Sequence, residues 1–233
     1  LLLDLKKSRY LSQSKLLQVN KLYYLILVFT LAGCKGDPID PIDFGNNYFP
    51  ISIGSEWNYI VDSTFYDEFN GGEATTKTVQ VRELVTDTFS DLAGHLNYFV
   101  ERKTYKDGSL ISTASYSVYN YNNQVIRVRD NQRIVILTFP VIEGNSWDGY
   151  AYTTRNEDDF LYLDVSEQSS FNGLELDSTV RVLHYEDTTN FIFKKYQEER
   201  YARNLGLYYS EYLLKETQQG VDSGVYVIQK LVE

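Results

Sequence analysis

Few residues of this chain could carry out nucleophilic or metal-assisted chemistry: one cysteine, Cys34, and two histidines, His95 and His184, in 233 residues. Nucleophilic catalysis by serine or cysteine needs a base, most often histidine, beside the nucleophile. Neither histidine lies in a metal-binding motif, and the sequence has no nucleophile elbow, no Cys-x-x-Cys pair and no phosphate or dinucleotide loop. We therefore predict no catalytic residue, no metal and no cofactor, with both histidines serving as ordinary surface or core residues.

Carboxylates remain as candidates, because a glycosidase needs only two of them across a cleft. The densest group, Glu157-Asp158-Asp159, is expected to be a solvated loop, since too few spaced oxygen ligands surround it for calcium. Asp67-Glu68 and Glu198-Glu199 are expected to be exposed strand or loop ends. Because the sequence does not say which carboxylates face each other, a carboxylate-pair glycan hydrolase stays open as an alternative.

The lone cysteine follows a segment typical of export signals. Lys15 and Lys21 precede an apolar run, 22–32, which matches a signal-peptide core and is too short to span a bilayer comfortably. Leu31-Ala32-Gly33-Cys34 then resembles the bacterial lipobox. The resemblance implies cleavage between Gly33 and Cys34, a diacylglyceryl group on the Cys34 thiol, and palmitate or a similar acyl chain on the freed amine. The alternative is a short hydrophobic segment with a chance cysteine.

Three segments follow from this interpretation. Residues 1–33 are expected to be a signal peptide. Because the sequence has no methionine, the start codon is expected to be misassigned, and residues before about 18 would then not belong to the signal peptide. Residues 34–47 would be the lipidated cysteine and a flexible tether, because Pro and Asp favour extended, solvated chain. The three Asp in it, at 37, 40 and 43, lack the spacing of a calcium loop. Residues 48–233 would form one β-rich domain.

The negative charge of the mature part argues against nucleic acid as a partner. Without 1–33 the chain keeps 200 residues (233 − 33) and a net charge of −14, since 17 of the 22 basic and 31 of the 32 acidic residues remain. Such a surface repels nucleic acid and anionic headgroups. One cysteine also means that no intramolecular disulfide can form, and lipidation accounts for an odd cysteine in an exported protein.

Apolar residues alternate with polar ones at a period of two, which indicates strands with one covered face. Examples are Val79, Val81 and Val85, and Ile126 and Val128, which alternate with Arg127 and Arg129. Turn signals separate the runs, and Asp107-Gly108 between 98–103 and 112–121 predicts a hairpin, followed by a strand over 124–129. We predict an all-β, mainly antiparallel fold: a single large curved sheet or a half-barrel or barrel-like meander of about ten strands, with few or no helices after the signal peptide.

Four segments together resemble a family of uncharacterised outer-membrane lipoproteins of Bacteroidota. They are 48–59 (YFPISIGSEWNY), 139–149 (FPVIEGNSWDG), 199–209 (ERYARNLGLYY) and 225–231 (VYVIQKL). Asn204 stands where the family often has glycine, and Tyr208 where it often has valine. The resemblance implies a location in the outer membrane and a β-rich fold, but it implies no activity. Trp57 and Trp147 are expected to pack in the core, with a role as ligand platforms as the alternative.

These features favour a membrane-anchored envelope lipoprotein that is a non-enzymatic binding or structural module. The expected partner is the lipid bilayer through acylated Cys34, in the outer membrane at its periplasmic face or the cell surface. The sequence does not identify a protein or glycan partner. A carrier or chaperone for an apolar ligand in a half-barrel cavity is an alternative, and would need an open apolar cavity of roughly 300 Å³ or more. A hydrolase would need two carboxylates roughly 5–9.5 Å apart across a cleft. We expect a filled core with a flat polar exterior, which favours the module.

Overall fold

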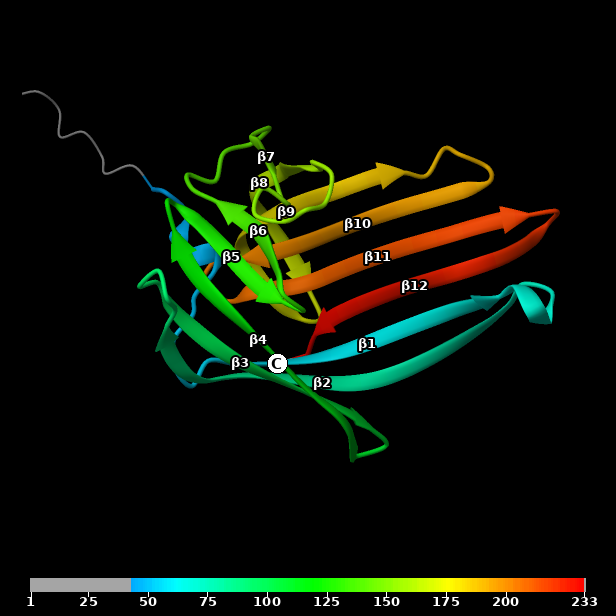
Figure 1. Ribbon diagram of the computed structural model, residues 1–233, viewed down its shortest axis with the longest axis horizontal. Helices are drawn as coiled ribbons and strands as arrows, with labels where there is room; N and C mark the ends of the chain where they lie inside the picture. Colours follow the sequence, from blue (N-terminus) through cyan, green and yellow to red (C-terminus); the bar gives the residue numbers. More distant parts are fainter. Residues whose placement is uncertain (1–42, 233) are drawn as a thin grey trace, which may run out of the picture. The chain divides into compact units, whose positions relative to one another are not determined.

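A computed structural model of the chain describes residues 43–232. This part contains twelve strands and two short 3-10 helices (Figure 1). The helices are η1 (Asn46–Tyr48) and η2 (Glu68–Asn70). The strands are β1 (Glu56–Asp67), β2 (Glu73–Ser90), β3 (Leu96–Lys106), β4 (Ser109–Tyr121), β5 (Gln124–Arg129), β6 (Gln132–Thr138), β7 (Ser146–Asp148), β8 (Asp159–Phe171), β9 (Leu174–Asp187), β10 (Phe193–Ala202), β11 (Gly206–Gln218) and β12 (Val221–Leu231).

All twelve strands belong to one antiparallel sheet, in the order β6-β5-β4-β3-β2-β1-β12-β11-β10-β9-β8-β7. Every neighbouring pair is consecutive along the chain except β1 and β12, which join two meanders at the middle of the sheet. Their register places Tyr59 opposite Leu231 and Phe65 opposite Val225. The first and last strands of the domain therefore pair with each other, and neither becomes an exposed edge.

The predicted all-β, antiparallel, barrel-like meander is confirmed. β3 and β4 form the hairpin expected around Asp107-Gly108, and β5 covers 124–129 as predicted. The sheet has twelve strands where about ten were expected. The three-residue β7 is one that the sequence does not reveal, because so short a segment shows no alternation. Pro140 lies outside the strands, after Phe139 in a cis peptide bond.

The sheet curls until its two edge strands approach each other. The Val135 amide of β6 donates to the Gly149 carbonyl just after β7 at 2.9 Å, and the Trp147 indole donates to the Val135 carbonyl at 2.8 Å. Register shifts interrupt the pairing of β2 with β3 and of β9 with β10. Such bulges add bend and twist to a sheet, which helps it to close.

The two ends of the strands differ in how far the sheet encloses a core. A cluster of buried side chains draws on η1 and eight strands, from β2 to β6 and from β8 to β10; we call this region the closed half. Its members are Tyr48, Val85, Val100, Val118, Val125, Ile136, Leu137, Phe160, Tyr162, Val180, Val182 and Tyr201. The open half comprises residues 62–67, 73–79, 193–197, 211–218 and 221–228. None of these residues is buried, and Figure 1 shows the long strands running out beyond β4–β6.

The chain enters the domain at the closed half. Asp43 makes an ion pair with Arg203 at 2.5 Å, and the Asn204 amide donates to the Asn47 carbonyl at 2.7 Å. Tyr48 is fully buried, and its hydroxyl lies 2.7 Å from the Ser178 hydroxyl. Residues 43–47, which the sequence assigns to a flexible tether, therefore lie against the domain. Residues 1–42 lie outside the described part, and within 43–232 no helix is long and apolar enough to cross a membrane.

Candidate functional site

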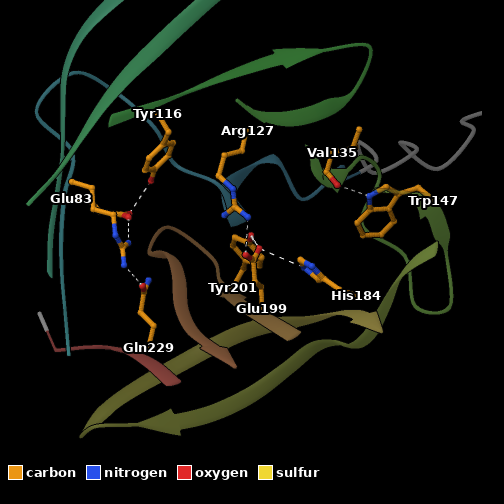
Figure 2. A network of polar contacts seen from close by, with 10 residues as sticks. Glu83, Tyr116, Arg127, Val135, Trp147, His184, Glu199, Tyr201 and Gln229 are labelled. Carbon is orange, nitrogen blue, oxygen red and sulfur yellow. Dashed lines mark hydrogen bonds and ion pairs between the residues drawn. The ribbon is translucent and has the colours of Figure 1, made fainter. Parts of the chain in front are cut away.

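The interior of the closed half carries polar side chains among its apolar ones. Inward positions on seven strands hold Glu83 of β2, Arg102 of β3, Tyr116 of β4, Arg127 of β5, His184 of β9, Glu199 and Tyr201 of β10, and Gln229 of β12 (Figure 2). Alternation carries every second residue of a strand to the same face, so Glu83 lies on the face of buried Val81 and Val85. These eight residues form the interior polar network.

One part of this network surrounds Glu83, which is 6% exposed. Arg102, its cross-strand neighbour, makes an ion pair with one carboxylate oxygen, and the Tyr116 hydroxyl donates to the other at 2.9 Å. The second terminal nitrogen of Arg102 donates to Gln229 Oε1 at 2.8 Å. Both oxygens of Glu83 are thus occupied by protein donors. Burial, with Glu83 beside it, raises the pKa of Tyr116, so its hydroxyl stays protonated as a donor.

The other part surrounds Glu199, which is 5% exposed. Arg127 Nη2 donates to Glu199 Oε1 at 3.1 Å, and the Tyr201 hydroxyl donates to Oε2. Burial by itself would raise the pKa of Glu199, but the charge of Arg127 and the hydrogen bonds from Tyr201 and Arg127 oppose it, and the pKa is lowered. Glu199 is therefore an ionised, paired carboxylate. A general acid requires the opposite shift, so this carboxylate is not prepared to donate a proton.

His184 lies next to this pair but does not bond to it. The side chain is almost completely buried, and neither ring nitrogen has a hydrogen-bond partner. Its ring stacks on Phe160 with centroids 3.9 Å apart, and Nε2 is 3.7 Å from Glu199 Oε2. Burial lowers the pKa of His184 to about 4, against the attraction of Glu199. At neutral pH the contact with Glu199 is thus one between a carboxylate and an uncharged ring.

The space left inside the closed half is small. A cavity of about 30 Å³ is lined by Glu83, Tyr116, Arg127 and Tyr201 together with Trp57 and other apolar residues. This volume holds one or two water molecules, far below the roughly 300 Å³ of a small-molecule site. The interior is therefore filled by the protein's own side chains, as expected from the sequence.

The flat polar exterior expected from the sequence is wrong: the outer surface has a larger depression, and large apolar side chains such as Leu92 and Phe69 are exposed on it. About 480 Å³ of open space lies beside Asn58, Ile60, Gln80, Arg82 and Tyr105. The positions of Asn58, Ile60, Gln80 and Arg82 alternate with inward-facing Tyr59, Val81 and Glu83, so these four lie on the face of the sheet opposite the network, although Tyr59 and Val81 also border the depression. It is open to solvent, and Arg82 pairs with Glu56 at its border.

Several residues singled out in the sequence have structural partners. Trp57 and Trp147 are both half-buried, and their indole nitrogens donate to the carbonyls of Leu205 and Val135 at 2.8 Å. Trp147 also packs on Phe160 and Tyr162. Both tryptophans thus pack against the core, although Trp57 also lines the small cavity. Cys34 and Gly33, the sites of lipid attachment and cleavage, lie outside the described residues.

The remaining candidates are not brought together. His95 lies in the loop after β2, where Nδ1 is 2.9 Å from Asp91 Oδ2, while His184 is in the core. In the 157–159 group, Asp158 pairs with Lys195 at 3.4 Å and its two neighbours are exposed. Within residues 43–232, no three His, Cys, Asp or Glu side chains are grouped as metal ligands would be.

The sequence interpretation was wrong for Glu198-Glu199 and for Arg127. Both glutamates are buried rather than exposed; Glu198, on the face opposite Glu199, is covered by Arg200, Arg181 and Tyr196, all of which contact it. Arg127 faces the interior, because Trp147 and its neighbours cover the other face of β5, where Ile126 is fully buried. Both faces of β5 are therefore covered. The only sequence signal was parity, since Glu199 lies two residues before Tyr201 and therefore shares its face of β10.

Comparisons with known proteins give structural matches only. No protein-family model matches the sequence, and no curated protein does. A protein named as a putative exported protein with a YmcC-like fold, from Bacteroides fragilis, has a TM-score of 0.44 and 11% identity over 79% of this chain and 97% of that chain. One named as a putative lipoprotein, from Parabacteroides distasonis, has a TM-score of 0.43 and 12% identity over 83% and 99%. A β-barrel-like protein with a domain of unknown function, from Brucella abortus, has a TM-score of 0.30 and 12% identity over 79% and 98%.

Proposed function

We propose that the chain is a lipid-anchored protein of the outer membrane whose β-domain is a non-enzymatic binding or structural module. The observation that carries the proposal is the position of the only thiol. Cys34 follows an 11-residue apolar run (22–32) and ends the lipobox-like Leu31-Ala32-Gly33-Cys34, with basic residues before it. Two acyl chains already anchor a protein stably, and a fully processed cysteine would carry three.

The organisation of the chain supports the same proposal. Residues 1–33 serve as the signal peptide, and 34–42 link the lipid to Asp43, where the compact unit begins. The four motifs quoted above resemble those of uncharacterised outer-membrane lipoproteins of Bacteroidota, which supports the proposal. The charge of −14 after cleavage keeps the domain in water beside an anionic leaflet rather than adsorbed over its whole surface.

The interior of the closed half supports a module rather than a hydrolase. The inward carboxylates Glu83 and Glu199 are both tied to arginine and tyrosine side chains, so they act as structural pairs. The cavity beside them is about 30 Å³, too small for a sugar ring or an acyl chain. The polar network thus specifies how the strands meet inside the sheet, while any partner would have to bind outside it.

Labelling the full chain with radioactive palmitate in a bacterial host tests the proposal. We expect label in the parent protein and in the membrane fraction, and neither in Cys34→Ser. A matched control, Cys34→Ser with Gly36→Cys, keeps one thiol two residues further on and should also lack label, because the lipobox register is lost. An unlabelled parent protein, or a Cys34→Ser variant that stays with membranes, would overturn the proposal.

Native mass spectrometry of the purified protein tests the module against the carrier. We expect the mass of the acylated chain alone, since the interior has no room for a ligand. A stoichiometric, non-covalently bound lipid that leaves on activation would favour a carrier and contradict a filled core.

A further inference from the structure

The end of the domain at which the chain enters presents a group of exposed apolar side chains. Phe44, Ile53, Leu92 and Ile142 are all exposed, Ile53 by 61% and Leu92 completely. They come from four separate segments: the stretch that enters the domain, the turn before β1, the β2–β3 loop and the β6–β7 loop. We call these four residues the tether face. Apolar residues gathered on successive loops are a common mark of an interaction surface.

The sheet topology puts these loops at one end. Glu56 at the start of β1 pairs with Leu84 near the end of β2, and Leu96 at the start of β3 pairs with Ser90. The Gly54 amide donates to the Val85 carbonyl at 2.9 Å, and the Val141 amide donates to the Phe44 carbonyl at 3.1 Å. The antiparallel register therefore places the four segments at the same ends of their strands as Asp43.

We propose that the tether face rests on the lipid leaflet that holds the acylated Cys34. This inference depends on the proposed lipid anchor, and the length of chain argues for the bilayer as the occupant. Nine residue steps separate Cys34 from Asp43 (43 − 34), which span at most roughly 30 Å when extended. The tips at the far ends of the 12-residue β1 and its neighbours lie about 40 Å further along the strands. The short tether thus holds this end near the leaflet at high effective concentration, so a weak apolar contact is sufficient.

The charges at this end also suit a leaflet. Asp43 is neutralised by its ion pair with Arg203, and Asp91 Oδ2 lies 2.9 Å from His95 Nδ1, whereas in the described part of the chain Asp67, Glu68 and Glu73 at the opposite end form no ion pair. The opposite end also exposes aromatic residues, Phe69 by 93% and Phe191 by 92%, but Phe69 is flanked by Asp67, Glu68 and Glu73. An anionic leaflet would repel that end.

The test uses the full, lipidated chain in vesicles of phosphatidylcholine and phosphatidylglycerol. In the lipidated protein Cys34 is blocked as a thioether, so a cysteine introduced by Leu92→Cys is the only reactive thiol. An environment-sensitive fluorophore there should shift to the blue and be quenched by spin-labelled lipid. The matched control, Phe69→Cys at the opposite end, should give neither change. Equal signals at both positions, or signals only at 69, would overturn the proposal.

A second variant checks that apolar contact is the cause. Ile53→Glu with Ile142→Glu should abolish the blue shift of the label at 92, whereas Phe69→Glu should leave it intact. Failure of the anchor itself is recognised separately: the parent chain would then take the label on Cys34 and would not float with vesicles. If an anchored protein leaves position 92 in water, the proposal fails, and protection seen only in native envelopes would assign the face to a protein partner.

Discussion

The closed and open halves share strands and an alternating sequence, yet they bury their residues differently. Val180 and Val182 of β9 are fully buried in the closed half, where side chains from eight strands meet. Val225 and Val227 of β12 show the same alternation in the open half and are only half-buried. The difference arises because the sheet faces itself at one end and faces water at the other. Alternation therefore reports which face a residue occupies, and closure decides whether that face is covered.

Polar contacts differ between the halves in the same way. In the closed half, arginine–carboxylate pairs lie inside the core, as with Arg127 and Glu199. In the open half, pairs such as Lys215–Asp222 and Thr64–Thr76 lie on accessible strand surfaces. Buried pairs are costly to break because one charge is left desolvated, whereas exposed pairs contribute little. The halves should therefore respond differently to equivalent substitutions.

The largest expected effect is the loss of Arg127. Arg127→Ala leaves the Glu199 carboxylate buried without its cation and should lower the free energy of unfolding by roughly 3–5 kcal/mol. The matched open-half variant Lys215→Ala breaks a partly exposed pair with Asp222 and should cost less than about 1 kcal/mol. Urea unfolding followed by tryptophan fluorescence measures both. Similar losses for the two variants would mean that the halves are not distinct.

The buried, uncharged His184 should make the free energy of unfolding depend on pH. Its pKa is about 4 in the folded protein and about 6.5 unfolded, so between these values only the unfolded state takes up the proton. Stability should therefore fall as pH drops from 6.5 to 4, by on the order of 3 kcal/mol from this residue. Glu199, whose pKa is lowered, adds a loss in the same direction only below about pH 4.5.

The variant His184→Leu isolates this effect. It should flatten the decline between pH 6.5 and 4, while any difference from the parent at pH 8 reports packing alone. Urea unfolding at a series of pH values gives the comparison. A decline of unchanged steepness in His184→Leu would assign the acid sensitivity to another group.

A smaller effect is expected at the seam that closes the sheet. A side chain at Gly149 would overlap the Phe160 ring, so Gly149→Ala should cost about 1–3 kcal/mol and loosen the contact between β6 and the end of β7. Amide hydrogen exchange should then speed up in 132–138 before it does in the open half. With Phe160→Leu as background, the added cost of Gly149→Ala should shrink; an unchanged cost would place the strain elsewhere.

The smallest effect is expected in the open half. Thr64 and Thr76 face each other across β1 and β2, with hydroxyl oxygens 2.8 Å apart. Thr64→Ala should cost about 0.2–1 kcal/mol, because no buried core lies under this pair. Thermal unfolding of the parent and the variant measures the difference. A loss of several kcal/mol would show that the open half has support beyond its cross-strand contacts.

Much of the fold could be predicted because strand signals are local. The period-two pattern and the turn at Asp107-Gly108 fixed the class and the β3–β4 hairpin, and β5 was found to the residue. β7 was missed, since it is recognisable only by its pairing with β8. Arg127 was assigned to the polar face of β5. When an arginine points into the core, a strand with both faces covered has the same alternating sequence as a strand with only one covered face.

The candidate site could not be predicted, because its members come together through register and closure. Glu83 and Arg102 are 19 positions apart, and Arg127 and Glu199 are 72 apart. The sequence by itself determined the strand class, the turns, the charge and the single thiol, since each depends on residue type and short spacing. Only the tertiary structure decided which polar residues are buried, how small the interior space is and which loops share an end. Those properties depend on contacts between strands far apart in the chain, and a local pattern carries no information about them.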